Sequence, residues 1–164
     1  MRVMIAAVGR ARSAPEQALC DLYLKRAGPL GAKLGFSKFD LVVTDTSRAP
    51  TPETRMAEEA TKLLKHAGSG HLIALDEGGR AMASEAFARH LATLRDRSRG
   101  IAFLIGGPDG LAPLLKTRTD ERLAFGIQTW PHLMVRAMLA EQIYRAMAIL
   151  SGHPYHRGQR PAAR

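Results

Sequence analysis

The sequence predicts an α/β protein in which helices cover both faces of a parallel sheet. Short apolar runs with strand character alternate along the chain with longer segments whose apolar residues recur at helical spacing. A strand, helix, strand order requires crossover connections, which favour parallel pairing. The chain has 164 residues, 46% of them hydrophobic, enough for one core. We therefore expect a single domain over 1–164, in which 151–164 is a C-terminal tail.

The first half of the chain predicts two strands, each followed by a helix. Ser13-Ala-Pro-Glu16 supplies an N-cap, an early proline and a capping-box glutamate, and Gly28-Pro29 is expected to stop that helix. Thr51-Pro52 opens the second helix in the same way. The expected elements are strand 2–8, the helix from Ser13 to Gly28, strand 36–43 and the helix from Thr51 to Gly68.

The second half predicts three more strands and three more helices. Ser84 is expected to cap the first of these helices. The expected elements are strand 71–75, the helix that Ser84 opens, strand 101–105, a short helix over 111–119, strand 123–128 and a long helix over 132–150.

The long last helix is apolar nearly all round, so it must be buried on two sides. The sheet can cover one side, and a second copy of the chain is the natural cover for the other, which predicts a homodimer. Glu141 and Arg145 stand at i, i+4 and are expected to form an ion pair on this helix.

The charge indicates a polyanionic partner. Lysine and arginine total 24 against 15 acidic residues, a net charge of +9 and an isoelectric point near 10.4. Arginine is prominent in this excess, and its planar fork suits phosphate oxygens. Arg10, Arg12 and the cluster from Arg95 to Arg99 are the expected phosphate contacts, although a solvated helix end explains the cluster equally well.

Other features exclude a membrane protein and a disulfide scaffold. No stretch approaches the roughly 18 apolar residues of a membrane span, and the N-terminus lacks the pattern of a secretory signal. The single cysteine, Cys20, stands among apolar residues and is expected to be buried and inert. We therefore expect a cytoplasmic protein without a membrane partner.

Three segments that follow strands have the composition of ligand-binding loops: "ALDEGG" (74–79), "LIGGPDG" (104–110) and "FGIQTWPH" (125–132). Ligands of open parallel sheets bind beyond the carboxyl ends of the strands, where these segments are expected to meet. The chain lacks both the dinucleotide-binding pattern after its first strand and the phosphate-binding P-loop pattern. One glycine-rich segment could be only a tight turn, but three loops of exposed main chain could hold the base and ribose of a nucleoside.

The segments "FLIGGPDGL", "WPHLMVRAMLAEQIYRA" and "HPYHR" closely resemble the small bacterial SPOUT-class methyltransferases that methylate N3 of a pseudouridine in 23S ribosomal RNA, the RNA methyltransferase H family. The resemblance spans nearly the whole chain. It implies a SPOUT fold with a C-terminal trefoil knot, a homodimer, S-adenosyl-L-methionine as cofactor, and a preference for the assembled ribosome. One departure is Ala112, where family members often have a serine or threonine as a helix cap.

The resemblance also implies which residues form the site. The cofactor contacts of the family fall on Leu75, Gly106, Phe125, Gly126, Ile127, Gln128, Thr129 and Trp130.

Methyl transfer from a sulfonium is an in-line displacement, so the protein must mainly position the reactants and favour loss of the N3 proton. His132, Arg136 and His153 are candidates for this second task, but we expect the tail residues Tyr155, His156 and Arg157 to be catalytic, once the tail orders over the cofactor.

Two alternatives remain from the sequence, and a metal is not expected. A zinc site on His153 and His156 is disfavoured because no cysteine or carboxylate stands nearby to complete it. A knotted methyltransferase that acts on another RNA nucleoside would carry the same motifs. A non-catalytic RNA-binding assembly factor could keep the fold without the activity.

Overall fold

The computed structural model describes residues 1–10 and 13–156. Five strands form one sheet in the order β2-β1-β4-β3-β5, and all of these strand pairs are parallel. The elements are β1 (Arg2–Val8), α1 (Pro15–Lys33), β2 (Lys38–Thr44), α2 (Pro52–Ala67), β3 (His71–Ala81), α3 (Ser84–Arg97), β4 (Gly100–Ile105), α4 (Pro113–Arg118), β5 (Glu121–Ala124) and α5 (His132–Leu150). The predicted parallel α/β architecture is confirmed.

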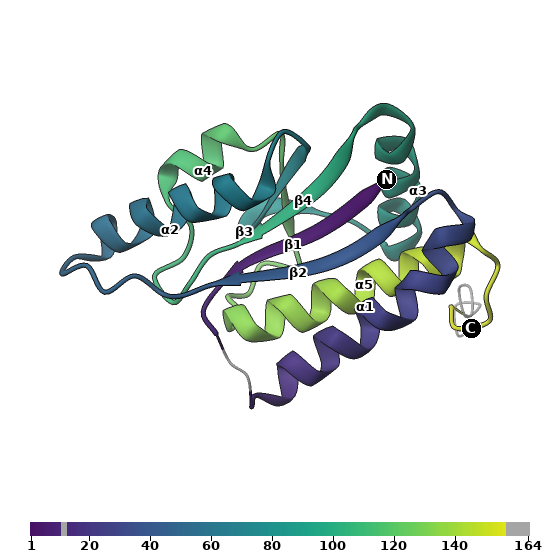
Figure 1. The fold of residues 1–164 in the computed structure, drawn as a ribbon, viewed down its shortest axis with the longest axis horizontal. Helices are drawn as coiled ribbons and strands as arrows, with labels where there is room; N and C mark the ends of the chain where they lie inside the picture. The colour runs from purple at the N-terminus through teal and green to yellow at the C-terminus, as the bar shows by residue number, and fades with distance from the viewer. Residues whose placement is uncertain (11–12, 157–164) are drawn as a thin grey trace, which may run out of the picture.

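Helices cover both faces of the sheet, α2 and α4 on one side and α1, α3 and α5 on the other (Figure 1). The inner strands β1 and β4 are buried on both faces, so alternate residues of one strand enter different cores. In β1, Val3, Ile5 and Ala7 belong to the core under α1, α3 and α5, whereas Met4, Ala6 and Val8 belong to the core under α2 and α4. None of the helices in the described part of the chain is long and apolar enough to cross a membrane.

The predicted end of the first helix at Gly28-Pro29 is wrong, because α1 continues to Lys33 with Pro29 inside it. A proline in a helix interior costs about 3 kcal/mol, since it lacks a hydrogen-bond donor and crowds the preceding turn. Packing offsets this cost: Leu24, Ala27 and Gly31 are buried, and a Cβ on Gly31 would lie 2.4 Å from the Phe39 ring. Local sequence does not reveal that close contact between helix and strand.

The predicted caps are confirmed for one helix and wrong for two. Thr51 caps α2, because its hydroxyl accepts a hydrogen bond from the Thr54 amide. The cap residues of α1 and α3 are Ala14 and Ala83, and neither makes a side-chain cap hydrogen bond. Ser84 is the first helical residue, and its hydroxyl donates to Gln142 of α5 instead. A tertiary contact has therefore taken the group that the local pattern assigned to the cap.

The last helix, α5, is covered within its own chain. It lies beside α1 along much of its length (Figure 1), packs on α3 and reaches β4. The predicted burial of this helix is confirmed, but one chain suffices to explain it. Apolar side chains remain exposed elsewhere, including Leu19 and Leu22 on α1 and Met134 on α5. The predicted ion pair between Glu141 and Arg145 is present.

Candidate active site

A cavity of about 410 Å³ opens beside the middle of β3 and beyond the carboxyl ends of β4 and β5. This volume falls in the usual range for small-molecule sites. Parts of the three predicted segments meet there, because parallel strands bring the residues that follow them to one edge of the sheet. Seven of the eight residues that the resemblance assigned to the cofactor line this cavity: Leu75, Gly106, Phe125, Gly126, Gln128, Thr129 and Trp130. The eighth, Ile127, is 93% exposed and is not part of the lining.

The glycine segment after β4 closes on itself. Gly107 and Gly110 form an isolated antiparallel bridge, and the Gly110 amide donates to the Gly107 carbonyl at 3.0 Å. A Cβ on Gly106 would lie 2.4 Å from the Gly110 carbonyl oxygen, so a side chain there collides with the loop itself. Gly110 has φ +87°, a left-handed conformation that favours glycine.

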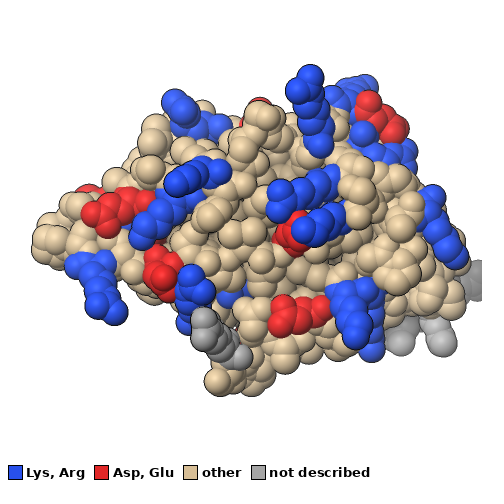
Figure 2. All heavy atoms as spheres, in the orientation of Figure 1, with Lys and Arg blue, Asp and Glu red and all other residues tan. Residues whose placement is uncertain are grey.

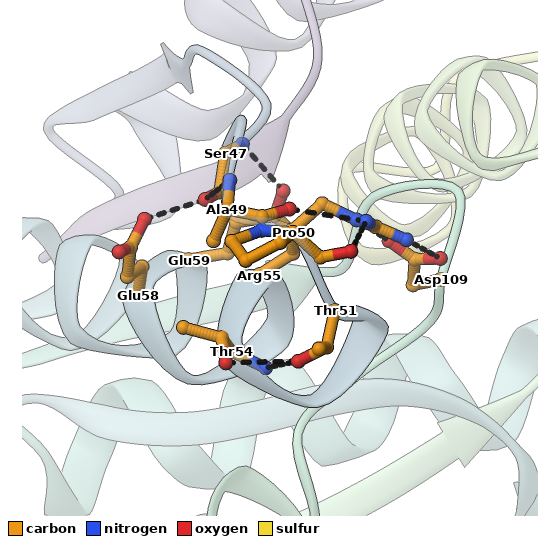
Figure 3. A network of polar contacts seen from close by, with 9 residues as sticks. All are labelled: Ser47, Ala49, Pro50, Thr51, Thr54, Arg55, Glu58, Glu59 and Asp109. Atoms are coloured by element: carbon orange, nitrogen blue, oxygen red, sulfur yellow. Dashed lines mark hydrogen bonds and ion pairs between the residues drawn. The ribbon is translucent and has the colours of Figure 1, made fainter.

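Polar contacts join this loop to α2 (Figure 3). Arg55 donates to both carboxylate oxygens of Asp109, at 2.7 and 2.9 Å, and also to the carbonyl of Ala49 at 3.1 Å. The hydrogen bond from Arg55 holds the pKa of the Asp109 carboxyl below its usual value. Both side chains are about three-quarters buried. The pair therefore fixes Asp109, a residue of the cavity lining, in its charged form.

Glu59 of α2 lies close to the same loop. It is 2% exposed, and its Oε1 accepts a hydrogen bond from the Ser47 amide at 2.8 Å. A Cβ on Gly107 would lie 3.0 Å from the Glu59 Oε2 atom, so the loop backbone and α2 approach closely only because Gly107 has no side chain. The helix α2 thus contacts the glycine segment at two points, the ion pair between Arg55 and Asp109 and the close approach of Glu59 to Gly107.

The third loop, after β5, presents main chain and polar side chains to the cavity. Gly126 has φ +104°, and the Trp130 indole N–H donates to the Phe125 carbonyl at 3.3 Å. The Thr129 hydroxyl donates to Glu77 at 2.7 Å, which joins this loop to β3. The predicted strand 123–128 is wrong beyond Ala124, because these residues form the loop instead.

The glycine pair Gly78-Gly79 does not have the predicted role of lining the ligand site. β3 continues past Leu75 to Ala81, with an irregularity in its pairing to β5 between Leu75 and Arg80. A Cβ on Gly79 would lie 2.7 Å from the backbone of β5, so this glycine allows the two strands to approach. The residues of this segment that do line the cavity are Leu75, Asp76 and Glu77.

The start of α5 closes one side of the cavity. His132 is part of the lining, and burial, together with the charge of Arg136, lowers its pKa below the ordinary value. Arg136 is 1% exposed and donates to the carbonyls of Val8 at 3.1 Å and Gly9 at 2.9 Å. Arg136 therefore joins α5 to the end of β1 and does not reach the cavity lining.

The structure does not bring the predicted catalytic residues of the tail to the cavity lining. The Tyr155 hydroxyl donates to Glu141 at 2.9 Å, and its ring packs on Tyr144 with centroids 4.5 Å apart. His156 lies 2.8 Å from a Glu85 oxygen. Burial and the Glu141 hydrogen bond raise the Tyr155 pKa well above its usual value, so the phenol stays protonated in this arrangement. Arg157 lies outside the described residues.

Charged residues at the rim of the cavity were not predicted as site residues. Asp76 is nearly buried and forms ion pairs with Lys116 at 3.1 Å and Arg122 at 3.0 Å. Asp76 and Glu77 stand in the first quoted segment (74–79) and Asp109 in the second (104–110), and that position is the signal that could have found them. Lys116 comes from α4 and has no such signal, because its place depends on how α4 packs.

Basic side chains outnumber acidic ones on the face shown in Figure 2. Of the expected phosphate contacts, Arg10 is half exposed and pairs with Asp45 at 2.6 Å. Arg95 makes three contacts within the fold: it donates to the Leu34 carbonyl, its guanidinium lies over the Phe36 ring, and it pairs with Asp96. Arg12 lies outside the described residues.

Comparison with known proteins shows the family to which the chain belongs. The model of a family described as "Predicted SPOUT methyltransferase" matches residues 1–156. A protein of Rhizobium meliloti named ribosomal RNA large subunit methyltransferase H is 50% identical over 159 residues, 96% of this chain and 99% of that protein. One of the same name from Nitrobacter hamburgensis is 48% identical over 160 residues, 96% of this chain and 100% of that protein.

Among solved structures, a probable methylase family protein from Haemophilus influenzae superposes with a TM-score of 0.49 at 11% identity, over 98% of this chain and 72% of that one. The family match and the two relatives cover nearly the whole chain. The chain belongs to the SPOUT methyltransferases and, within them, to the ribosomal RNA large subunit methyltransferase H family.

Proposed function

We propose that this protein transfers a methyl group from S-adenosyl-L-methionine to N3 of a pseudouridine in 23S ribosomal RNA, on the assembled ribosome. The observation that carries the proposal is the single cavity that seven of the eight expected cofactor residues line. Membership of a family whose relatives are named for large-subunit ribosomal RNA supports the substrate class. The net charge of +9 supports a polyanionic partner.

The lining fits this cofactor in size and in chemistry. A cavity of about 410 Å³ suits a nucleoside with a short side chain. The glycine loop exposes amides and carbonyls without side chains in front of them, and these groups can bind a base and a ribose. Asp76, Glu77 and Asp109 supply carboxylates around a ligand that carries a sulfonium and an ammonium charge.

When bound, the cofactor would supply a methyl carbon on a sulfonium for transfer to N3. The protein's own residues would hold N3 in line with that carbon and accept the proton that N3 loses. His132 lines the cavity and is neutral near pH 7 because its pKa is lowered, so it can accept that proton. The tail residues Tyr155, His156 and Arg157 serve the reaction only after the tail leaves its contacts with Glu141 and Glu85.

The remaining parts of the proposal concern assembly and location. We place the protein in the cytoplasm, as a homodimer with a C-terminal trefoil knot and without a membrane partner. The exposed Leu19 and Leu22 side chains, 42% and 40% exposed, support a further contact surface on α1. Sedimentation of the full chain tests the dimer, which predicts twice the mass of 17.9 kDa.

Mass spectrometry of ribosomal RNA nucleosides tests the activity. Deleting the gene should remove one N3-methylated pseudouridine from 23S RNA, and expressing the intact chain should restore it. Loss of a different methylated nucleoside would favour a SPOUT enzyme with another target. An unchanged nucleoside profile would overturn the proposal.

Calorimetry with S-adenosyl-L-methionine separates an enzyme from a non-catalytic binding factor. The proposal predicts saturable binding to the purified full chain. No binding, together with retained binding to ribosomes, would favour an assembly factor that has the fold without the activity.

A further inference from the structure

A second cluster of chemically active side chains lies at the edge of the sheet opposite the cavity. His71 is the first residue of β3 and Glu121 is the first residue of β5, so both stand at the amino ends of their strands. His90 comes from the middle of α3. The three side chains are partly buried, with 20%, 28% and 25% of their surfaces exposed.

The register of the sheet explains why these residues meet. Glu121 pairs with Ile73, and His71 stands two residues before Ile73, so His71 and Glu121 share one face of the sheet. α3 covers this face with the buried residues Phe87 and Leu91. His90 precedes Leu91, and its ring comes to the edge of the sheet beside Glu121.

The ligand atoms of the cluster are close to one another. His71 Nε2 lies 2.6 Å from Glu121 Oε1, and His90 Nε2 lies 2.8 Å from Glu121 Oε2. One ligand atom from each of the three residues lies within 4.8 Å of the other two. His90 Nε2 is sealed from solvent and makes no hydrogen bond among the described residues, although it lies 2.8 Å from the Glu121 carboxylate. A buried ring nitrogen that faces a carboxylate without a hydrogen bond is available as a metal ligand.

A second carboxylate lies near the first histidine. Asp120 accepts a hydrogen bond from the Leu72 amide at 2.8 Å and donates its own amide to the Leu72 carbonyl at 2.9 Å. Its Oδ2 atom lies 3.8 Å from His71 Nδ1, which is too far for a hydrogen bond. A carboxylate on this side of the ring is placed where the outer shell of a metal-bound imidazole lies. Two carboxylates facing two imidazoles also concentrate negative charge in a strongly basic protein.

We propose that His71, His90 and Glu121 bind a divalent transition-metal ion, zinc foremost, with a fourth position open to water. Two histidines and one carboxylate are a known zinc ligand set, with metal–ligand distances of about 2.0–2.2 Å. The site would join the edge strand β5 to β3 and α3, and β5 leads directly into the loop at Phe125. The earlier expectation of no metal considered only His153 and His156. This proposal does not rest on the proposed methyl transfer.

Zinc titration of the full chain against a chromophoric chelator tests the site. One equivalent should bind, and His90→Ala and Glu121→Gln should each raise the zinc Kd at least about tenfold. His66→Ala is the matched control, because His66 is an exposed histidine on α2 that takes no part in the cluster. Equal zinc binding by wild type and both cluster variants, or no binding by wild type, would overturn the proposal.

Thermal unfolding guards against variants that fail to fold. Zinc should raise the Tm of wild type and of His66→Ala, because a ligand that binds only the folded state stabilises it. Zinc at the same concentration should raise the Tm of His90→Gln less than that of wild type, and the metal-free Tm of each variant reports whether it folds. A Tm of His90→Gln that rises with zinc as much as that of wild type would contradict the site.

Discussion

At the scale of single residues, the structure gives Gly106 a second role in addition to the one that the sequence predicts. From the sequence, Gly106 is predicted to place its main chain against the cofactor, without a side chain in between. In the structure it also closes the glycine loop, because a Cβ would lie within 3 Å of the Gly110 carbonyl. Gly106 must therefore be a glycine for the loop as well as for the cavity.

We predict that Gly106→Ala weakens S-adenosyl-L-methionine binding at least about tenfold, a change of about 1.4 kcal/mol, because the loop must open to admit the methyl group. Gly28→Ala is the matched control. A Cβ on Gly28 meets nothing within 4 Å, and alanine in a helix is favoured over glycine by about 0.5–1 kcal/mol. Calorimetry gives the affinity and thermal unfolding gives the stability. Unchanged affinity in Gly106→Ala would show that the loop is not part of the cofactor site.

His132 gives a pH prediction at the same scale. Burial and the charge of Arg136 lower the pKa of His132 below the ordinary histidine pKa of 6.5. The ring therefore stays neutral to a lower pH than that of an ordinary histidine. If His132 accepts the N3 proton, kcat should be constant near neutral pH and fall only as the pH drops through this lowered pKa. His132→Gln should reduce kcat by about 100-fold or more and leave the cofactor KM nearly unchanged. A His132→Gln profile that matches wild type would assign the base elsewhere.

At the scale of elements, α2 holds the glycine loop through Arg55. This guanidinium donates to both oxygens of Asp109 and to the carbonyl of Ala49 (Figure 3). It therefore connects α2 with the glycine loop and with the segment that precedes α2 in the chain. A bidentate pair depends on the planar fork of arginine, which lysine does not reproduce.

We predict that Arg55→Ala raises the cofactor KM, on the order of fivefold, with a smaller effect on kcat, because the loop loses its attachment. Arg55→Lys should restore only part of the affinity. Arg2→Ala is the control, because Arg2 forms an ion pair with Asp40 at the far end of β1. Equal KM values for wild type and Arg55→Ala would mean that the loop holds its shape without α2.

At the scale of the whole molecule, the position of the tail in the structure differs from the position that the proposed catalysis requires. Tyr155 and His156 pack against α5 and α3 and are not among the residues that line the cavity. A chain truncated after Ser151 should bind S-adenosyl-L-methionine as tightly as the full chain but lose methyl transfer to ribosomes. Paired calorimetry and methyl-transfer assays check this. Full turnover by the truncated chain would remove the tail from the mechanism.

Much of the fold could be predicted from the sequence because the inner strands β1 and β4 are buried on both faces. Arg2–Val8 and His132–Leu150 have the predicted bounds, since uninterrupted apolar patterns define them. The errors occur where distant segments decide: Pro29 is tolerated by packing, Ser84 bonds to α5, and Gly79 serves the approach of β3 to β5.

The sequence by itself determined the parallel α/β class and the meeting of three segments at one edge, because parallel strands with helical crossovers must bring their carboxyl ends together. Two of these segments are loops, and the first is part of β3. Only the tertiary structure decided which residues of those segments line the cavity. It also decided that Arg55 donates to Asp109 and that the Tyr155 hydroxyl donates to Glu141. It also brought together His71, His90 and Glu121, which are separated by as many as 50 positions. The physical reason is that side-chain contacts between elements depend on register and packing, which no local pattern encodes.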